Sequence, residues 1–116
     1  MLFKVHELIG RTAVSRESGL VIRNAIIKQL TTENAETVIL DFVDVDIYAS
    51  PFFNTSIAPL LENMSIEDLK SKLRFENITP LGRFLLNQVI HNAIEFYAKS
   101  EEEQNKIHDN LHDHLD

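Results

Sequence analysis

The sequence predicts an α/β fold: a small mixed sheet of four to five strands packed against about three helices. Runs of strand-like composition alternate with runs of helical period, which is the pattern of strands covered by helices. Residues 38–47 are mostly β-branched or large and apolar, as in a strand buried on both faces. Two later helical periods each open on a hydroxyl residue followed by proline, Ser50-Pro51 and Thr79-Pro80, and this pair suits the start of a helix.

The first third of the chain is expected to supply one or two strands and one helix. The segment Leu2–Ile9 alternates and predicts a strand that ends at Gly10, and residues 11–16 are either a connection or a short second strand through residues 12–14. Ser15 is the expected N-cap of a helix that ends near Leu30. The expected buried face of this helix is formed by Ile22, Ala25, Ile26 and Leu30.

The remainder is expected to supply two more helices and a further strand after the central one. The helix that begins at Ser50 has an apolar face of Phe53, Ile57, Leu60, Leu61 and Met64. The pattern leaves open whether Pro59 bends this helix or ends it. Ser65 is expected to cap a short turn, and Leu73–Ile78 alternates as a strand does. The last helix begins at Pro80, with one stripe formed by Leu81, Leu85, Val89, Ala93 and Phe96.

Composition and charge narrow the class of function. With 116 residues the chain has the length of one domain, and it contains no apolar run of about 18 residues that would span a membrane. It has no cysteine, so disulfides and thiol chemistry are excluded. The net charge of −7 argues against nucleic acid as a partner. We therefore expect a cytoplasmic protein with neither a membrane nor a nucleic-acid partner, and a homodimer stays open.

Charge also divides the chain into a domain, residues 1–99, and an acidic tail, residues 100–116. Residues 99–116 hold six acidic residues against two lysines, so they carry −4 of the total charge. The tail is expected to be helical or disordered. His108 and His112 stand four residues apart, the spacing of a helical pair of metal ligands, but they belong to a solvated acidic segment, and no metal site is predicted.

Three short motifs, taken in order, resemble one known family. They are Val14-Ser15-Arg16 with Gly19, the run VILDFVDV from Val38 followed by Ser50–Asn54, and LRFENITP from Leu73 followed by an amphipathic helix. Their order and spacing are similar to the STAS fold of sulfate transporters and anti-sigma-factor antagonists. They are most similar to the small bacterial and phage group of STAS-like domains of unknown function. The resemblance covers about residues 2–98.

The resemblance implies a non-enzymatic regulatory module that acts through a protein partner. In anti-sigma-factor antagonists, the turn after the central strand carries a serine that an ATPase-like kinase phosphorylates, and Ser50 stands at that position. The resemblance thus implies an ATPase- or kinase-type partner and a working surface of Tyr48, Pro51, Phe52 and Asn54 around Ser50. The family more often has Asp, Ser and Gly where this chain has Ala49, Pro51 and Phe52, so Ser50 as an unmodified N-cap stays the structural alternative.

The alternative function is a small-ligand or nucleotide sensor that binds an anion at the N-terminus of the Ser50 helix. The candidate anion or partner contacts are Ser15, Arg16, Asp41 and Asp44, although Arg16 could instead pair with one of the two carboxylates. The two carboxylates could also serve acid–base or metal chemistry, but for Asp41 a hydrogen bond to neighbouring backbone is the expectation. The sequence contains no phosphate-binding glycine loop and no nucleophile elbow, so neither an enzyme nor a cofactor is predicted.

Overall fold

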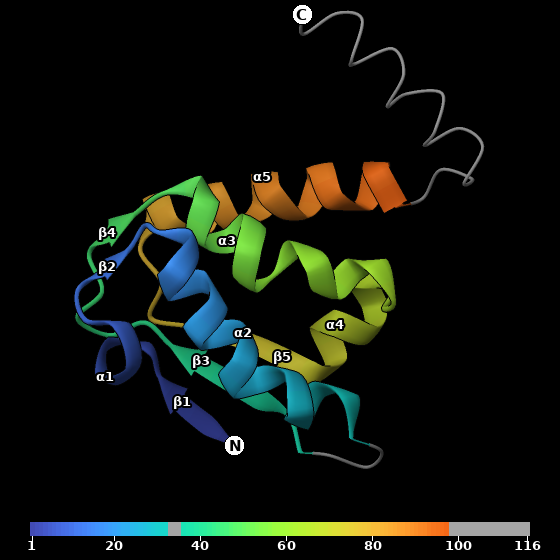
Figure 1. Ribbon diagram of the computed structural model, residues 1–116, viewed down its shortest axis with the longest axis horizontal. Coiled ribbons are helices and arrows are strands. Elements are labelled where there is room, and N and C mark those ends of the chain that lie inside the picture. The colour runs from blue at the N-terminus through green and yellow to red at the C-terminus, as the bar shows by residue number, and fades with distance from the viewer. Residues whose placement is uncertain (33–35, 98–116) are drawn as a thin grey trace, which may run out of the picture.

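The structure is a computed structural model that describes residues 1–32 and 36–97 (Figure 1). Its strands are β1 (Leu2–Lys4), β2 (Thr12–Ala13), β3 (Val38–Asp41), β4 (Ile47–Tyr48) and β5 (Leu73–Glu76). Its helices are α1 (Val5–Ile9), α2 (Arg16–Thr31), α3 (Ser50–Ser56), the 3₁₀-helix η1 (Ala58–Glu62), α4 (Ile66–Lys72) and α5 (Pro80–Tyr97). The expected acidic tail, residues 100–116, lies outside the described residues.

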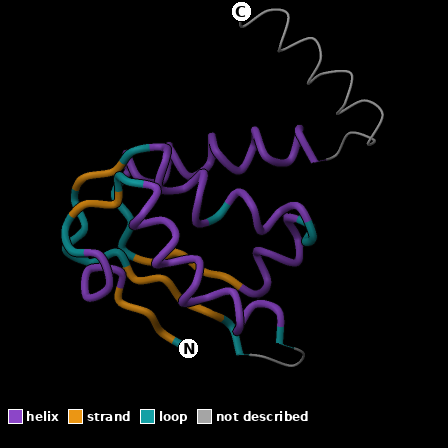
Figure 2. The backbone as a smooth tube through the Cα atoms, in the orientation of Figure 1, coloured by secondary structure: helices purple, strands orange, loops and turns teal. Residues whose placement is uncertain are grey.

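The strands form two separate parallel sheets, where the sequence predicted one mixed sheet. In the larger sheet β3 lies between β1 and β5, and Leu40 is paired with Phe3 on one side and Phe75 on the other. The smaller sheet consists of β2 and β4 alone. Figure 2 shows the three-stranded sheet beneath the helices and the short pair at one end of the molecule. Parallel neighbours require crossover connections, and helices lie between the paired strands along the chain.

The first predicted strand is half strand and half helix, so the prediction for Leu2–Ile9 was wrong in its second part. Only Leu2–Lys4 pairs with β3, and the chain then turns into α1, which buries Val5 completely. Gly10 ends α1 with φ +82°, and its N–H donates to the carbonyl of His6. The strand β3 has only four residues, and β1 pairs with it at three positions. The alternating pattern of Leu2–Ile9 therefore does not continue as a paired strand.

The predicted central strand, residues 38–47, is interrupted by a turn. The N–H of Val45 donates to the carbonyl of Phe42, and Asp44 adopts a positive φ of 66°. The carboxylate of Asp41 accepts hydrogen bonds from the N–H of Val43 (3.0 Å) and from the side-chain amide of Asn77 (2.8 Å). Because Phe42 and Val45 are both buried, the apolar run looks like one strand in sequence although it forms two.

Three predicted helix starts are confirmed by their hydrogen bonds. The hydroxyl of Ser15 accepts from the N–H of Ser18 at 3.0 Å, and the hydroxyl of Ser65 accepts from Asp68 at 3.1 Å. The hydroxyl of Thr79 accepts from the N–H of Gly82 at 3.1 Å and so caps α5. The central helix α3 ends at Ser56, before Pro59, and a separate 3₁₀-helix, η1, follows from Ala58.

The buried face of α5 is rotated from the predicted stripe. Its buried residues are Gly82, Leu86, Val89 and Ala93, whereas the predicted Leu81 and Phe96 are exposed. Gly82 explains the rotation, since a Cβ there would lie 2.8 Å from the ring of Tyr48. The absence of that Cβ lets this side of α5 approach β4. Among the described residues no helix is long and apolar enough to cross a membrane.

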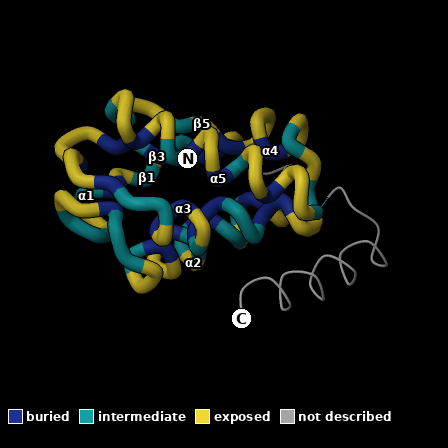
Figure 3. Tube along the Cα trace, turned by 90° about the horizontal axis from the view of Figure 1, so that it is seen from above, coloured by how far each residue is buried: buried dark blue, intermediate teal, exposed yellow. Residues whose placement is uncertain are grey.

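An aromatic cluster fills the core between the helices and the larger sheet. Its members are Phe42, Tyr48, Phe52, Phe53 and Phe75, with ring centroids 5.1 to 6.5 Å apart. Figure 3 shows the buried stretches toward the middle of the molecule and the exposed turns on the outside. Tilted and edge-to-face pairs of this kind add to the stabilisation that comes from burial alone.

Candidate functional site at the start of α3

Two helix starts lie side by side at one end of the molecule, because β2 and β4 are paired in parallel. Ala13 is in register with Tyr48, and the N–H of Ala49 donates to the carbonyl of Ala13 at 3.0 Å. The chain leaves these two strands in the same direction and enters α2 and α3 almost at once. The sequence-predicted candidates on these helices, Ser15 and Arg16 on one and Ser50 on the other, are thereby brought together.

Gly19 sets how closely the two helices approach. A Cβ at this position would lie 2.7 Å from the carbonyl oxygen of Phe52 and 2.8 Å from Cβ of Thr55. Real Cβ atoms do not lie so close to other heavy atoms, so only glycine allows this packing of α2 on α3. The backbone of the first turn of α3 is therefore positioned by a residue of α2.

Ser50 does not cap α3, so the N-cap interpretation was wrong. Ala49 occupies the cap position with extended backbone (φ −148°), and Ser50 is the first helical residue. The Ser50 side chain is partly buried, and its hydroxyl makes no hydrogen bond to the residues that the structure describes. The N–H of Phe52 is bonded to the backbone carbonyl of Ala49 at 3.2 Å. The hydroxyl thus has no structural hydrogen bond that a partner would have to break.

Two residues of the predicted working surface are buried, and that part of the prediction was wrong. Phe52 is fully buried in the aromatic cluster, and only 7% of Tyr48 is exposed. The Tyr48 hydroxyl donates to the carbonyl of Val45 at 3.0 Å, and burial raises the pKa of the phenol. The large side chains that suggested an interface are instead the residues that anchor the turn to the core.

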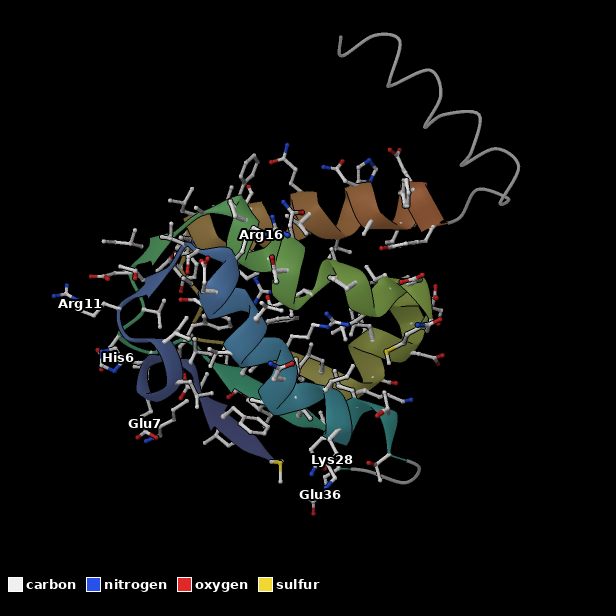
Figure 4. All side chains as sticks on the ribbon, viewed as in Figure 1. His6, Glu7, Arg11, Arg16, Lys28 and Glu36 are labelled. Carbon is white, nitrogen blue, oxygen red and sulfur yellow. The ribbon has the colours of Figure 1, made fainter. Side chains whose placement is uncertain are left out.

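The exposed part of the site is small and polar. Pro51 and Asn54 of α3 are exposed, and Arg16 is exposed on the first turn of α2 (Figure 4). Ser15 is occupied as the N-cap of α2. The surface that a partner can reach here therefore consists of Ser50, Pro51 and Asn54 beside Arg16.

The two candidate carboxylates have different surroundings. The pKa of Asp41 is lowered by the hydrogen bond from Asn77 and then by that from the Val43 N–H, so its role is structural, as expected. Asp44 is exposed in the turn. Among the described residues, neither carboxylate forms the ion pair with Arg16 that the sequence suggested. Arg11 is the arginine that pairs in this region, with Asp46 at 2.7 Å.

Metal chemistry receives no support from the part of the chain described. Within residues 1–32 and 36–97, no group of three or more His, Asp or Glu side chains is arranged to hold a metal ion. His108 and His112 lie outside these residues.

The structure also shows a groove that the sequence reasoning missed. It lies between α4, β5 and α5 and is lined by Lys70, Arg74 and Arg83 above apolar side chains. The only signal in the sequence is the spacing of three cations among apolar residues from 66 to 90. That signal does not show that three separate elements meet.

A parallel α/β domain in which a strand–turn–helix packs against the start of another helix is of the STAS-like class. The sequence matches the family described as STAS-like domain of unknown function over residues 18–83, more than half of the chain, and the protein belongs to that family. The match includes the β3–α3 region and β5, and it begins just after Ser15 and Arg16. Neither the curated proteins nor the solved structures contain a match to the chain.

Proposed function

We propose that the protein is a non-catalytic regulatory module that binds a protein partner through Ser50, Pro51 and Asn54 with Arg16 beside them. The observation that supports this proposal is the Ser50 hydroxyl, which is at the first residue of α3, does not cap that helix and makes no hydrogen bond to any described residue. A serine with no structural task beside exposed Pro51 and Asn54 is free to contact or to be modified by a partner. The family likeness suggests a regulatory or interaction module, and a partner of the ATPase or kinase type is the finer proposal.

Phosphorylation of Ser50 would act through charge. A phosphoryl group adds about −1.5 to −2 charges, and at the first turn of a helix it meets the positive end of the helix dipole. The modification would therefore be tolerated by the fold while it changes the surface that the partner contacts. Arg16, exposed at the start of the neighbouring helix α2, is the cation that we expect to pair with it.

The test compares capture of a partner from native cells by the full chain and by matched surface variants. Asn54→Lys should lose the partner, whereas Asn92→Lys, an equally exposed asparagine on α5, should retain it. Ser50→Glu should change the amount of partner captured and Ser50→Ala should not. The intact mass of the protein recovered from cells should show a phosphorylated fraction that is absent from the Ser50→Ala variant.

Two results would overturn the proposal. Equal capture by Asn54→Lys and Asn92→Lys would remove the start of α3 from the interface. A rise in melting temperature with inorganic phosphate, lost in the Ser50→Glu variant, would favour the anion-sensor alternative in its place.

A further inference from the structure

Two adjoining hollows form a groove along α5, on the side of α5 that faces α4 and β5. The first hollow has a volume of about 350 Å³ and lies between α4, β5 and the stretch of α5 from Arg83 to Ile90. The second, of about 370 Å³, lies farther along α5 at Ile94 and Tyr97. Ile66 of α4 lines both, so the two hollows are neighbours along α5. Volumes of this size are typical of small-molecule sites.

The two ends of the groove differ in charge. Lys70, Arg74 and Arg83 line the first hollow, and Glu76 is the one acidic residue among its lining side chains. The second hollow is apolar except for Ser65 and Glu67. None of the three cations has a carboxylate within ion-pair distance in the part of the chain that the structure describes. A protein of net charge −7 thus keeps unpaired positive charge at one end of an apolar groove.

Arg83 is held at the groove by the edge of the larger sheet. Because β5 is an outer strand, the carbonyl of Phe75 is free to accept from Nη2 of Arg83, at 3.3 Å. The guanidinium has further N–H groups, which a carboxylate can accept in pairs. The floor next to it is apolar and is formed by Leu69, Leu73, Leu86 and Ile90.

We propose that this groove binds a free single-chain carboxylate of the fatty-acid type. The carboxylate lies among Arg74, Arg83 and Lys70, and the hydrocarbon chain lies along the floor toward Ile94 and Tyr97. A head-and-tail ligand matches a groove that is cationic at one end and apolar at the other, whereas a purely ionic or a purely apolar ligand would leave one end unmatched. The site shares no residue with the surface around Ser50, so either proposal can fail without the other.

The chain's own residues 98–116 are the competing occupant. Their apolar residues Ile107, Leu111 and Leu115 recur at every fourth position, a spacing that would place them on one face of a helix. Asp109, Asp113 and Asp116 fall on the opposite side of that pattern, whereas a free fatty acid carries its carboxylate at the end of the hydrocarbon chain itself. The match of head and tail to the two ends of the groove therefore favours the free ligand.

The experiment titrates the full chain with dodecanoate below its micelle-forming concentration and measures affinity by calorimetry and the shift in melting temperature. Dodecanol supplies the chain without the charge, and acetate supplies the charge without the chain. Dodecanoate is expected to bind at least about tenfold more tightly than either, since a charge-assisted pair with arginine contributes on that order. Arg83→Gln should weaken dodecanoate about tenfold or more. Lys28→Gln, an exposed cation on α2 outside the groove, should not (Figure 4).

A second variant locates the hydrocarbon chain. Ile94→Gln changes a side chain that is 36% exposed at the far hollow, so the fold should tolerate it. It should weaken dodecanoate while leaving the affinity for hexanoate, whose shorter chain ends before that hollow, unchanged.

Four outcomes would overturn the proposal. Equal affinity for dodecanol and dodecanoate would show that the cations are not used, and equal affinity of Arg83→Gln and Lys28→Gln would place the ligand elsewhere. Binding to anionic lipid vesicles without binding of free dodecanoate would make the groove a membrane contact. Binding that is lost when Ile107, Leu111 and Leu115 are replaced together by serine in the full chain would assign the hydrocarbon contact to that segment.

Discussion

The β4–α3 turn and the α4–β5–α5 groove are opposites in how they use large and charged side chains. The turn points its aromatic residues inward, so that Tyr48 and Phe52 are buried and only small or polar groups face water. The groove is lined by apolar side chains along its length and carries its cations, Lys70, Arg74 and Arg83, at one end. The turn is conspicuous in the sequence, and the groove is not.

This difference determines which kind of partner or ligand each region can bind. The turn is tightly constrained by its packing against α2 at Gly19, so a partner there would meet a rigid surface of few side chains. Recognition of such a surface depends on one or two groups, and a change of charge at Ser50 would alter much of it. The groove provides volume and charge instead, which suits a small ligand.

The largest expected effect separates two phenylalanines. Phe52→Ala should lower the free energy of unfolding by about 3–5 kcal/mol, because it empties a fully buried position in the aromatic cluster. Phe84→Ala should change it by less than about 0.5 kcal/mol, because Phe84 on α5 is 63% exposed. Chemical denaturation of both variants measures the contrast. Similar losses would mean that Phe84 is covered by something outside the described residues, and the comparison of the two regions would fail.

The next effect tests the constraint on the turn. Gly19→Ala should destabilise the protein by about 1–3 kcal/mol, since the new Cβ meets the backbone of α3 at 2.7 Å and the two helices must separate. Asn24→Ala is the control on α2, an exposed position where alanine favours the helix. Thermal or denaturant unfolding gives both values. A Gly19→Ala variant as stable as the wild type would show that α2 and α3 can adjust, and the turn could then not be called rigid.

The sequence predicted correctly those features, such as helix caps, that contacts between neighbouring residues determine. Ser15, Ser65 and Thr79 were each identified as caps, and each makes the expected bond to an amide three residues on. Ser50 was assigned the same role wrongly. The conformation of Ala49 is set by pairing with Ala13, 36 residues earlier in the chain, so Ala49 takes the cap position and the helix begins one residue earlier than the local pattern indicates.

The other errors have the same origin. The run of residues 38–47 is broken by a turn whose Asp41 is bonded to Asn77 from beyond β5, and no local pattern shows that bond. Phe52 was assigned to the working surface by the family resemblance, but α2 packs over that side of α3 and Phe52 is fully buried. The groove is built from three elements that are separate in the sequence, so only the tertiary structure reveals it.

A smaller effect distinguishes a structural serine from a free one. Ser15→Ala should cost about 1 kcal/mol, because it removes the N-cap bond to Ser18, whereas Ser50→Ala should cost less than about 0.5 kcal/mol. Denaturant unfolding of the pair measures the difference. A loss of about 1 kcal/mol in Ser50→Ala would mean that its hydroxyl caps α3 in solution, and Ser50 would then have a structural task.

The smallest effect concerns a bond between the end of β3 and the residue that follows β5. Asp41 ends β3 before the turn, and Asn77 follows β5 of the groove, with 2.8 Å between the carboxylate and the amide nitrogen. This bond, and next the one from the Val43 N–H, hold the pKa of Asp41 below its ordinary value. Because the pKa is lower in the folded than in the unfolded protein, the carboxylate stabilises the fold above the unfolded-state pKa of about 4. That contribution is lost as the pH falls through the folded-state pKa.

Asp41→Asn keeps an oxygen that can accept both bonds but cannot ionise, so it isolates the charge. The difference in free energy of unfolding between wild type and Asp41→Asn should be constant from about pH 7 to 5 and should shrink below about pH 4. Its size should be about 0.5 kcal/mol, because both bonds lie at the exposed surface and water screens them. Urea unfolding at a series of pH values measures it. A difference that stays constant down to the acid transition would mean that the charge of Asp41 does not hold Asn77, and that packing alone joins the ends of β3 and β5.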